Sequence, residues 1–234
     1  MRMLLVLITM AVSFASNGQY ETRGLTSDLQ RVDTYVNRND KDLKYEVPND
    51  YEGSPYYNEA FVMGNIYEGN KLLGTNIPMR FNIFSNEIEV KENLATPNSE
   101  AKPLTKSSDI FVKMGNTIIV LIPFNGSDEE GSYFEVLFEG KKVDLMKKVE
   151  KEYSPPVKAS SSITRDLKAA FTDDVTYFLQ TKNGRMYQLP KAKHKKLSIF
   201  GPKEPALQAF IDENNLNINA QEDLLRVIRQ YDSM

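Results

Sequence analysis

The sequence predicts a mainly β (α+β) protein, with an antiparallel meander sheet or partly closed barrel and short C-terminal helices. From about residue 57, short runs rich in aromatic and β-branched residues recur roughly every ten residues. Gly, Asn and Pro separate these runs, which is typical of strands joined by tight turns. No long helical pattern lies between them, so consecutive hairpins are favoured over a parallel α/β sheet.

The beginning of the chain has the pattern of a signal peptide. One early cation, Arg2, precedes an uncharged apolar run from Leu4 to Phe14, about half of the roughly 20 residues that a bilayer-spanning helix needs. Small residues follow, and cleavage after Ala15 or Gly18 fits the pattern. We expect residues 1–18 to be a signal peptide, with no transmembrane segment after cleavage; an uncleaved anchor or a buried strand is the alternative.

The amino-acid composition of the chain excludes several classes of function. The chain has no cysteine, 29 basic and 32 acidic residues, and a net charge of −3. A charge so near balance gives no reason to expect nucleic acid or an anionic membrane as partner. Without cysteine there is no thiol nucleophile, Cys-ligated zinc, iron–sulfur cluster or disulfide, so an apolar core must hold the domain together.

Residues 19–55 are expected to be a polar lead-in segment, and residues 56–234 one β-rich domain. Its hairpins have turn signals at Gly69-Asn70, Ser85-Asn86, Gly115-Asn116, near Gly140 and at Asn183-Gly184. The last signal is the strongest, because both central residues of a type I′ turn need positive φ. Residues 154–171, before this hairpin, are interpreted as a surface excursion, with a short helix as one interpretation of its end.

The hairpin from Ile77 to Asn93 alternates apolar and polar residues. Met79, Phe81 and Ile83 share one face of its first strand, and Ile88 and Val90 alternate with acidic residues in the second. We therefore expect one dry face and one wet face. A ligand would first be sought on the wet face, near Arg80, Asn82, Glu87 and Glu89.

The chain is expected to close with two short amphipathic helices, within about residues 203–232. Leu207, Phe210 and Ile211 share one face of the first helix. The second is expected to start with Asn219 as N-cap and Glu222 three residues later, a capping box. Its apolar stripe comprises Leu224, Leu225, Ile228 and Tyr231. Both stripes are expected to pack on one face or end of the sheet; the alternative is that one stripe binds a partner protein.

The sequence gives little support for a catalytic site. A serine-hydrolase triad needs a histidine, and the sole one, His194, lies in a lysine run without a GxSxG elbow. Paired carboxylates need no histidine: Glu87 and Glu89 share a strand face, and Asp173-Asp174 precede the last hairpin. We assign no catalytic residue and keep a carboxylate-dependent glycan hydrolase as an alternative.

Metal and cofactor sites are not expected either. Residues 212–223 begin like a calcium loop, but Leu216 occupies the fifth position, Asn217 replaces the required glycine and Asp223 stands where a glutamate is needed. The sequence has neither a P-loop nor a GxGxxG motif, so nucleotide binding has no support.

A basic run late in the chain carries the candidate binding residues. They are Arg185, Lys191, Lys193, His194, Lys195 and Lys196. This run could meet an anionic glycolipid, a polyanionic glycan or an acidic protein surface. A surface that only confers solubility is the alternative.

Several segments together resemble a known group of sequences. They are "GSPYYNEAFVMGNIYEG", "IPMRFNIFSNEIEVK", "YFEVLFEG", "YFLQTKNGRMYQLPK" and "EDLLRVIRQYD", which cover much of the chain after the expected signal. This combination resembles uncharacterised exported proteins of Gram-negative bacteria. The resemblance implies an exported, β-rich envelope or secreted protein without assigned activity, and it transfers no functional residues.

The sequence thus favours a non-enzymatic exported envelope protein, a binding or structural/adaptor module, periplasmic or outer-membrane-associated/extracellular. An envelope or outer-membrane protein is the possible partner, and no cofactor is expected. The alternatives are the carboxylate-dependent glycan hydrolase and a carrier of a lipophilic ligand, which would need the sheet to curl around an apolar cavity.

Overall fold

The computed structural model describes residues 50–159, 161, 163 and 165–234. The expected signal peptide and the lead-in up to residue 49 lie outside the described residues. The elements in chain order are β1 (Tyr51–Glu52), β2 (Val62–Glu68), β3 (Lys71–Asn82), β4 (Glu87–Val90), the 3-10 helix η2 (Asn98–Glu100), β5 (Lys102–Pro103), β6 (Ile110–Met114), β7 (Thr117–Phe124), β8 (Ser127–Glu139), β9 (Val143–Ser154), β10 (Ala169–Thr181), β11 (Met186–Gln188), α2 (Lys193–Lys196), the 3-10 helix η3 (Ser198–Lys203), α3 (Glu204–Glu213) and α4 (Gln221–Ser233).

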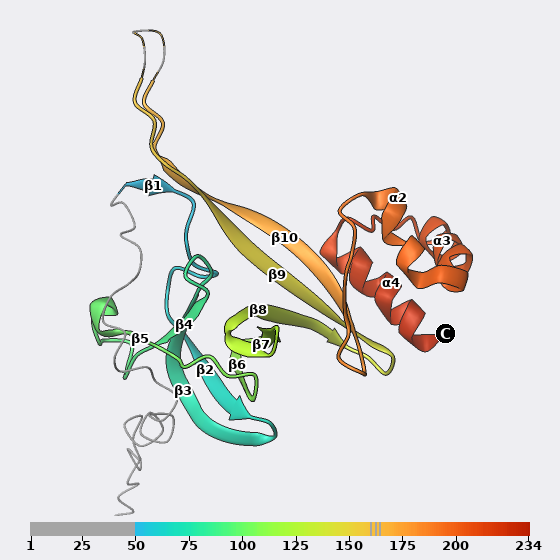
Figure 1. The fold of residues 1–234 in the computed structure, drawn as a ribbon, viewed down its shortest axis with the longest axis horizontal. Coiled ribbons are helices and arrows are strands. Elements are labelled where there is room, and N and C mark those ends of the chain that lie inside the picture. Colours follow the sequence, from blue (N-terminus) through green and yellow to red (C-terminus); the bar gives the residue numbers. More distant parts are fainter. Residues whose placement is uncertain (1–49, 160, 162, 164) are drawn as a thin grey trace, which may run out of the picture.

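The described strands form one open sheet, which confirms the predicted fold class. Its order is β1-β10-β9-β8-β7-β6-β2-β3-β4-β5, and β11 also pairs with β10. Neighbours are antiparallel except β1 and β10. Figure 1 shows β2 to β8 strongly curled at one end, a long twisted ribbon of β9 and β10, and the C-terminal helices beside that ribbon. The sheet does not close into a barrel.

The early turns lie where the sequence places them. Gly69 and Gly115 have positive φ values, 53° and 57°, in two-residue connections between β2 and β3 and between β6 and β7. Asn86, φ 56°, lies in the turn from β3 to β4. Left-handed conformations strongly favour Gly and Asn, so these turn predictions are confirmed.

The late hairpin between β10 and β11 is also confirmed, but its expected turn type is wrong. Gly184 has φ 81°, whereas Asn183 does not adopt positive φ. Thr181 accepts a hydrogen bond from the Gly184 N–H at 2.8 Å and donates its own N–H to the Arg185 carbonyl at 2.9 Å. This is the three-residue loop in which a type I turn precedes one left-handed residue, and it needs glycine at only one position.

The sheet buries two separate apolar clusters. The first fills the curled end and contains, among others, Ile66, Ile77, Met79, Val112 and Ile119, all at most 1% exposed. These side chains come from alternate positions of their strands, so the curvature of the sheet surrounds them. Burial of each such side chain contributes roughly 1.5–3 kcal/mol to folding.

The second apolar cluster lies between the β9–β10 ribbon and the C-terminal helices. Leu145 and Leu179 of the ribbon pack in one cluster with Leu207, Leu224 and Ile228 of the helices. Figure 1 shows the helices gathered at this one end of the sheet. The stripe of α4 packs on this end of the sheet, as predicted, whereas α3 packs on η3 and α4 within the same cluster.

A polar clamp fixes the end of α4 to the same part of the sheet. The Asp232 carboxylate accepts hydrogen bonds from the backbone N–H groups of Lys141, Lys142 and Val143, at 2.8, 2.6 and 3.3 Å. Lys141 and Lys142 lie in the connection between β8 and β9 that the sequence placed near Gly140, and Val143 begins β9. Although desolvation opposes the change, the backbone hydrogen bonds hold the pKa of Asp232 below its usual value.

Strands β9 and β10 continue beyond the sheet as a narrow arm (Figure 1). Val157 and Leu167 pair across the arm with backbone hydrogen bonds of 2.9 and 2.8 Å. Residues 169–171 already belong to β10, so the interpretation of this stretch as a short helix is wrong. No helix in the described part of the chain is both long and apolar enough to cross a membrane.

Candidate functional site

The face of β3 and β4 that was expected to be wet is buried. Arg80, Asn82 and Glu89 are 8%, 5% and 6% exposed. Glu89 accepts hydrogen bonds from Arg80 at 2.5 and 3.0 Å and from Asn82 at 3.1 Å. The Arg80 guanidinium lies 3.6 Å from the ring centre of Tyr56 and 4.5 Å from that of Phe61. The segment before β2 therefore covers this face, and the prediction that it would be open to a ligand is wrong.

The other acids of the hydrolase hypothesis also have cationic partners. Asp173 pairs with Lys151, and Asp174 pairs with Lys191. Glu89 likewise pairs with Arg80, whereas the half-buried Glu87 does not belong to this paired set. Pairing with a lysine or arginine leaves a carboxylate fewer lone pairs for proton transfer.

The stretch that begins like a calcium loop is a helix-to-helix turn. The Asp223 carboxylate accepts the backbone N–H of Asn217 at 2.8 Å. Within residues 50–159 and 165–234, no three acidic or histidine side chains are grouped so that they could hold a metal ion.

The structure divides the predicted basic run into exposed and buried parts. The exposed residues are Arg185, Lys191, Lys193 and Lys195. Lys196 is only 5% exposed, and the side chain of His194 lies outside the described side chains. Lys191 and Lys196 border the same cavity, so part of the run is brought together there.

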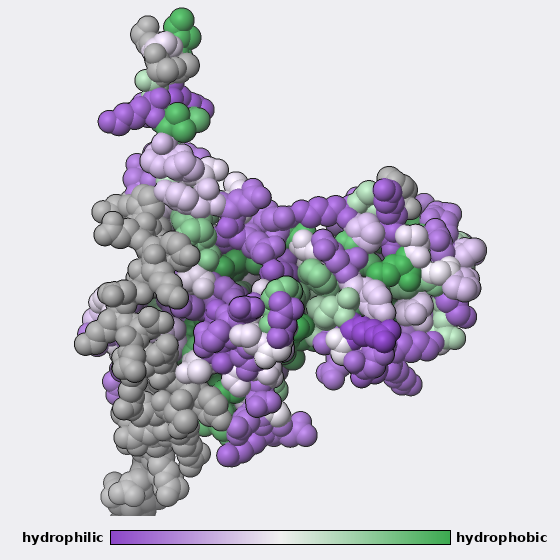
Figure 2. Space-filling view, viewed as in Figure 1, coloured by the Kyte–Doolittle hydropathy of each residue, from purple (hydrophilic) through white to green (hydrophobic). Residues whose placement is uncertain are grey.

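This cavity, which we call the basic hollow, has a volume of about 450 Å³ and lies between the β9–β10 ribbon and the helical end of the molecule. Figure 2 shows the helices as a lobe joined to the rest of the molecule through a narrower waist. Three of the ten lining residues are lysines and none is acidic. The lining residues that matter below are Lys147, Tyr177, Lys191, Lys196, Asn219 and Gln221.

Lys196 is the buried cation of the basic hollow. Its amine donates hydrogen bonds to the Ile218 carbonyl at 3.2 Å and to Asn219 Oδ1 at 2.7 Å, both neutral acceptors. An ammonium group has three donors, so one of them has no partner among the described residues. Burial lowers the pKa of Lys196, because the charged form loses hydration. A bound anion would offset that loss.

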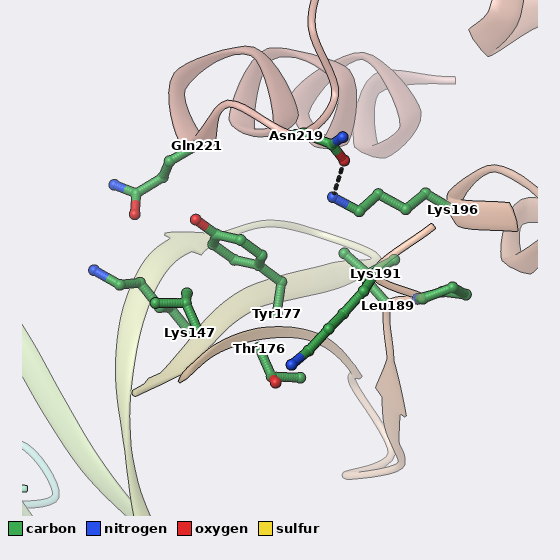
Figure 3. A pocket seen from close by; sticks show the side chains of 10 residues that line it. Lys147, Thr176, Tyr177, Leu189, Lys191, Lys196, Asn219 and Gln221 are labelled. Carbon is green, nitrogen blue, oxygen red and sulfur yellow. Dashed lines mark hydrogen bonds between the residues drawn. The ribbon is translucent and has the colours of Figure 1, made fainter. Parts of the chain in front are cut away.

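Tyr177 and Gln221 add two more polar groups without partners. Neither the Tyr177 hydroxyl nor the Gln221 amide makes a hydrogen bond to any described residue. Figure 3 shows both groups directed into the same space, together with the Lys147 amine, whereas Lys191 points away. Burial raises the pKa of Tyr177, so its hydroxyl keeps its proton and can donate.

Lys147 closes the basic hollow on the side of the curled sheet. Its amine lies 2.8 Å from a carboxylate oxygen of Glu135, which also accepts the Tyr57 hydroxyl at 3.1 Å. Although desolvation acts in the opposite direction, the hydrogen bond and charge of Glu135 raise the pKa of Lys147. Lys147 is therefore charged but already balanced by one carboxylate.

The N-terminus of α4 adjoins the basic hollow. The expected capping box is wrong: α4 begins at Gln221 after the N-cap Ala220, which has no capping side chain. The side-chain oxygen of Asn219 accepts from Lys196 instead. A helix N-terminus carries about half a positive charge, which the acidic residues Glu222 and Asp223 in the first turn of α4 offset. Asn219 and Gln221, on either side of this N-cap, both line the hollow.

The sequence identified only part of this site. Lys191 and Lys196 belong to the predicted basic run, but Lys147, Tyr177, Asn219 and Gln221 were not singled out. Their sequence signals are weak, because Lys147 and Tyr177 are opposite each other on paired strands only once the β9–β10 register is known. No local pattern reports that register.

Comparison of the chain with protein-family models, with curated proteins and with solved structures finds no match. The resemblance to uncharacterised exported proteins therefore stays a prediction, and the function rests on the geometry of the site.

Proposed function

We propose that this chain is a non-enzymatic exported envelope protein that binds a small anion in the basic hollow. One observation carries the proposal: three polar groups without partners among the described residues meet at one cavity. They are one donor of Lys196, the Tyr177 hydroxyl and the Gln221 amide. Buried polar groups normally have partners, and a ligand would supply one to the free donor of Lys196 here, with the half-buried Tyr177 and Gln221 beside it.

The charges around the hollow favour a ligand with one negative charge. Glu135 balances Lys147, and Asp174 balances Lys191. Lys196 has no carboxylate partner in the described part of the chain. One uncompensated lysine suits a carboxylate better than a multiply charged polyanion.

The assignment to a binding role is supported by the chemistry of the lining. A general acid–base mechanism needs a group that can exchange a proton near neutral pH, at hydrogen-bonding distance from the ligand. The pKa of Tyr177 is raised, away from neutrality. Two carboxylates pair with lining lysines: Glu135 is held by Lys147 and Tyr57, and Asp174 is held by Lys191. Donors without an opposing base are suited to holding an anion.

The test is a calorimetric titration of the full-length chain with sodium acetate, sodium phosphate and sodium sulfate at constant ionic strength. We expect acetate to bind, and Lys196→Met to weaken that binding at least tenfold. Methionine has a similar length and no charge, and burial disfavours the charge of Lys196, so this variant should remain folded. Lys195→Met, at the exposed neighbouring position, is the matched control and should bind as the parent does.

Two results would overturn the binding proposal. One is the absence of heat with all three anions, and the other is equal binding by Lys196→Met and the parent chain. Tighter binding of sulfate or phosphate than of acetate would keep the site but reject the preference for one negative charge.

Export is proposed on the N-terminal pattern and is tested separately. Mass spectrometry of the chain recovered from the envelope of its own cells should find a protein that starts at Ser16 or Gln19. A chain that keeps Met1 and remains in the cytosolic fraction would reject export without affecting the proposed binding site.

A further inference from the structure

One edge of β10 is open between two short strands. β1 pairs with this strand at Ala169 and Ala170, and β11 pairs at residues 178–180. Among the described strands, only β9 pairs with residues 172–176, and β9 lies along the opposite edge of β10. The other edge of this five-residue stretch is therefore free of strand pairing by described residues.

The direction of the free backbone groups follows from one hydrogen bond. The Tyr177 carbonyl accepts the Leu189 N–H at 2.8 Å, so it points toward the edge that β11 occupies. Backbone groups alternate sides along a strand, so the N–H and C=O of Val175 and Asp173 point to the same edge. At its far end the edge is closed at Gly53, where an added Cβ would lie 2.2 Å from the Phe171 carbonyl oxygen.

The basic hollow reaches this open edge. It is lined by Val175, Thr176 and Tyr177, three consecutive residues of β10. Side chains of consecutive strand residues point to opposite faces, so a cavity that touches all three extends around the edge of the strand. Pro190 and Lys191, which follow β11, form the rim at this edge.

Extended peptides commonly bind proteins by adding a strand to an open sheet edge, and a free carboxyl end needs a positive site at the end of that strand. Both features adjoin here: Val175 and Asp173 offer backbone partners, and Lys196 offers a site for one negative charge. We propose that the ligand of the basic hollow is the C-terminal carboxylate of an extended peptide, whose preceding residues pair with the open edge of β10. This inference rests on the proposed anion site and narrows its ligand to a peptide end.

The charges at the edge fit such a peptide. Asp174 and Lys191 neutralise each other beside the open stretch, and Asp173 is paired with Lys151. The only lining cation not balanced by a carboxylate of the described chain is Lys196, at the inner end of the site. A neutral peptide backbone can therefore approach the edge, while its carboxylate is drawn toward Lys196.

The test uses two pools of random hexapeptides, one with free C-terminal carboxylates and one with C-terminal amides, passed over the immobilised full-length chain. We expect the free acids to be enriched at least tenfold over the amides. A third pool of free acids, N-methylated at alternate residues, should be retained at least tenfold less, because methylation removes the strand donors.

Protein variants separate the two parts of the site. Val175→Pro removes an N–H from the open edge only, which an edge strand tolerates, and Val175→Ala keeps that N–H as the matched control. Val175→Pro should retain the free acids at least tenfold less than Val175→Ala does. Urea unfolding of both variants checks that each is folded.

The outcomes distinguish this inference from the anion site beneath it. If acetate binds in a Lys196-dependent way but acids and amides are retained equally, the peptide inference is wrong and the anion site stands. Equal retention by Val175→Pro and Val175→Ala would reject strand addition in the same way. If acetate does not bind and no pool is retained, both are wrong.

Discussion

The two ends of the sheet each bury a lysine, and they satisfy it differently. At the curled end, Lys91 is 6% exposed and donates to the Leu94 and Thr96 carbonyls and to Asn98 Oδ1, at 3.1, 2.8 and 3.0 Å. At the helical end, Lys196 is 5% exposed and has only two acceptors within the described chain. Three acceptors use all the donors of an ammonium group, whereas two leave one donor for a ligand.

The same contrast extends to the surroundings of each lysine. Lys91 also lies 4.5 Å from the ring centre of Phe61, close to the Arg80–Glu89 pair. Lys196 borders a cavity with two further polar groups that lack partners among the described residues. Complete satisfaction indicates a structural role, and incomplete satisfaction beside a cavity indicates binding. Burial of a charge alone does not separate these roles.

The largest effect is expected at the curled end, from Glu89→Ala. It leaves the Arg80 guanidinium buried without its carboxylate, which costs about 3–5 kcal/mol of unfolding free energy. Urea unfolding of the full-length chain measures this loss. Asp174→Ala breaks a pair in which the side chains of Lys191 and Asp174 are 62% and 38% exposed; it is the control and should cost no more than about 1 kcal/mol. Equal losses would mean that water reaches Arg80.

Lys91→Met tests the structural lysine directly. The change removes all three hydrogen bonds and should lower the unfolding free energy by about 2 kcal/mol, since the acceptors lose their donor. The exposed Lys102→Met on the adjacent β5 should change it by less than about 0.5 kcal/mol. A loss at Lys91 no greater than at Lys102 would remove the distinction between the two buried lysines.

Asp232→Ala probes how the helical end is attached to the sheet. Loss of three hydrogen bonds to a carboxylate should cost about 1.5 kcal/mol in urea unfolding at neutral pH. The pKa of Asp232 is lowered on folding, so its contribution is present above the ordinary value of 3.8 and is lost as pH falls through the folded value. The variant and the parent should therefore converge in acid. Asp212→Ala, where the carboxylate accepts from Gln208 on the exposed face of α3, should show a smaller loss at neutral pH.

Local features of the fold were predictable from the sequence because the physics that sets them is local. Alternation placed Met79 and Phe81 in the core, and the left-handed preference of Gly and Asn placed most of the turns. The turn at Gly184 was misassigned because Asn-Gly also fits a loop with a single left-handed residue.

Features that depend on distant contacts were not predictable. Alternation implied an exposed Arg80, but Tyr56 and Phe61, about twenty residues earlier in the chain, cover it. Asn219 had the sequence pattern of a helix cap, but its oxygen accepts from Lys196 once η3 and α3 fold back. The basic hollow could not be predicted from the sequence for the same reason. Its residues come from β9, β10, α2, α4 and the segments that precede the two helices, and they meet only in the folded chain.

The smallest stability effect is expected from Lys196→Met, which in the absence of ligand should change the unfolding free energy by less than about 1 kcal/mol. Loss of two hydrogen bonds is opposed by relief of the desolvation of the charged amine. Burial lowers the folded pKa below the ordinary 10.5, so between these two values the unfolded chain binds more protons and the parent gains stability as pH rises. The variant has no such group. The unfolding free energy of the parent relative to Lys196→Met should therefore increase from neutral pH to pH 10.5. A difference that stays constant with pH would mean that the Lys196 amine is hydrated in the free protein. A bound anion would then gain no binding free energy from compensating a desolvated charge.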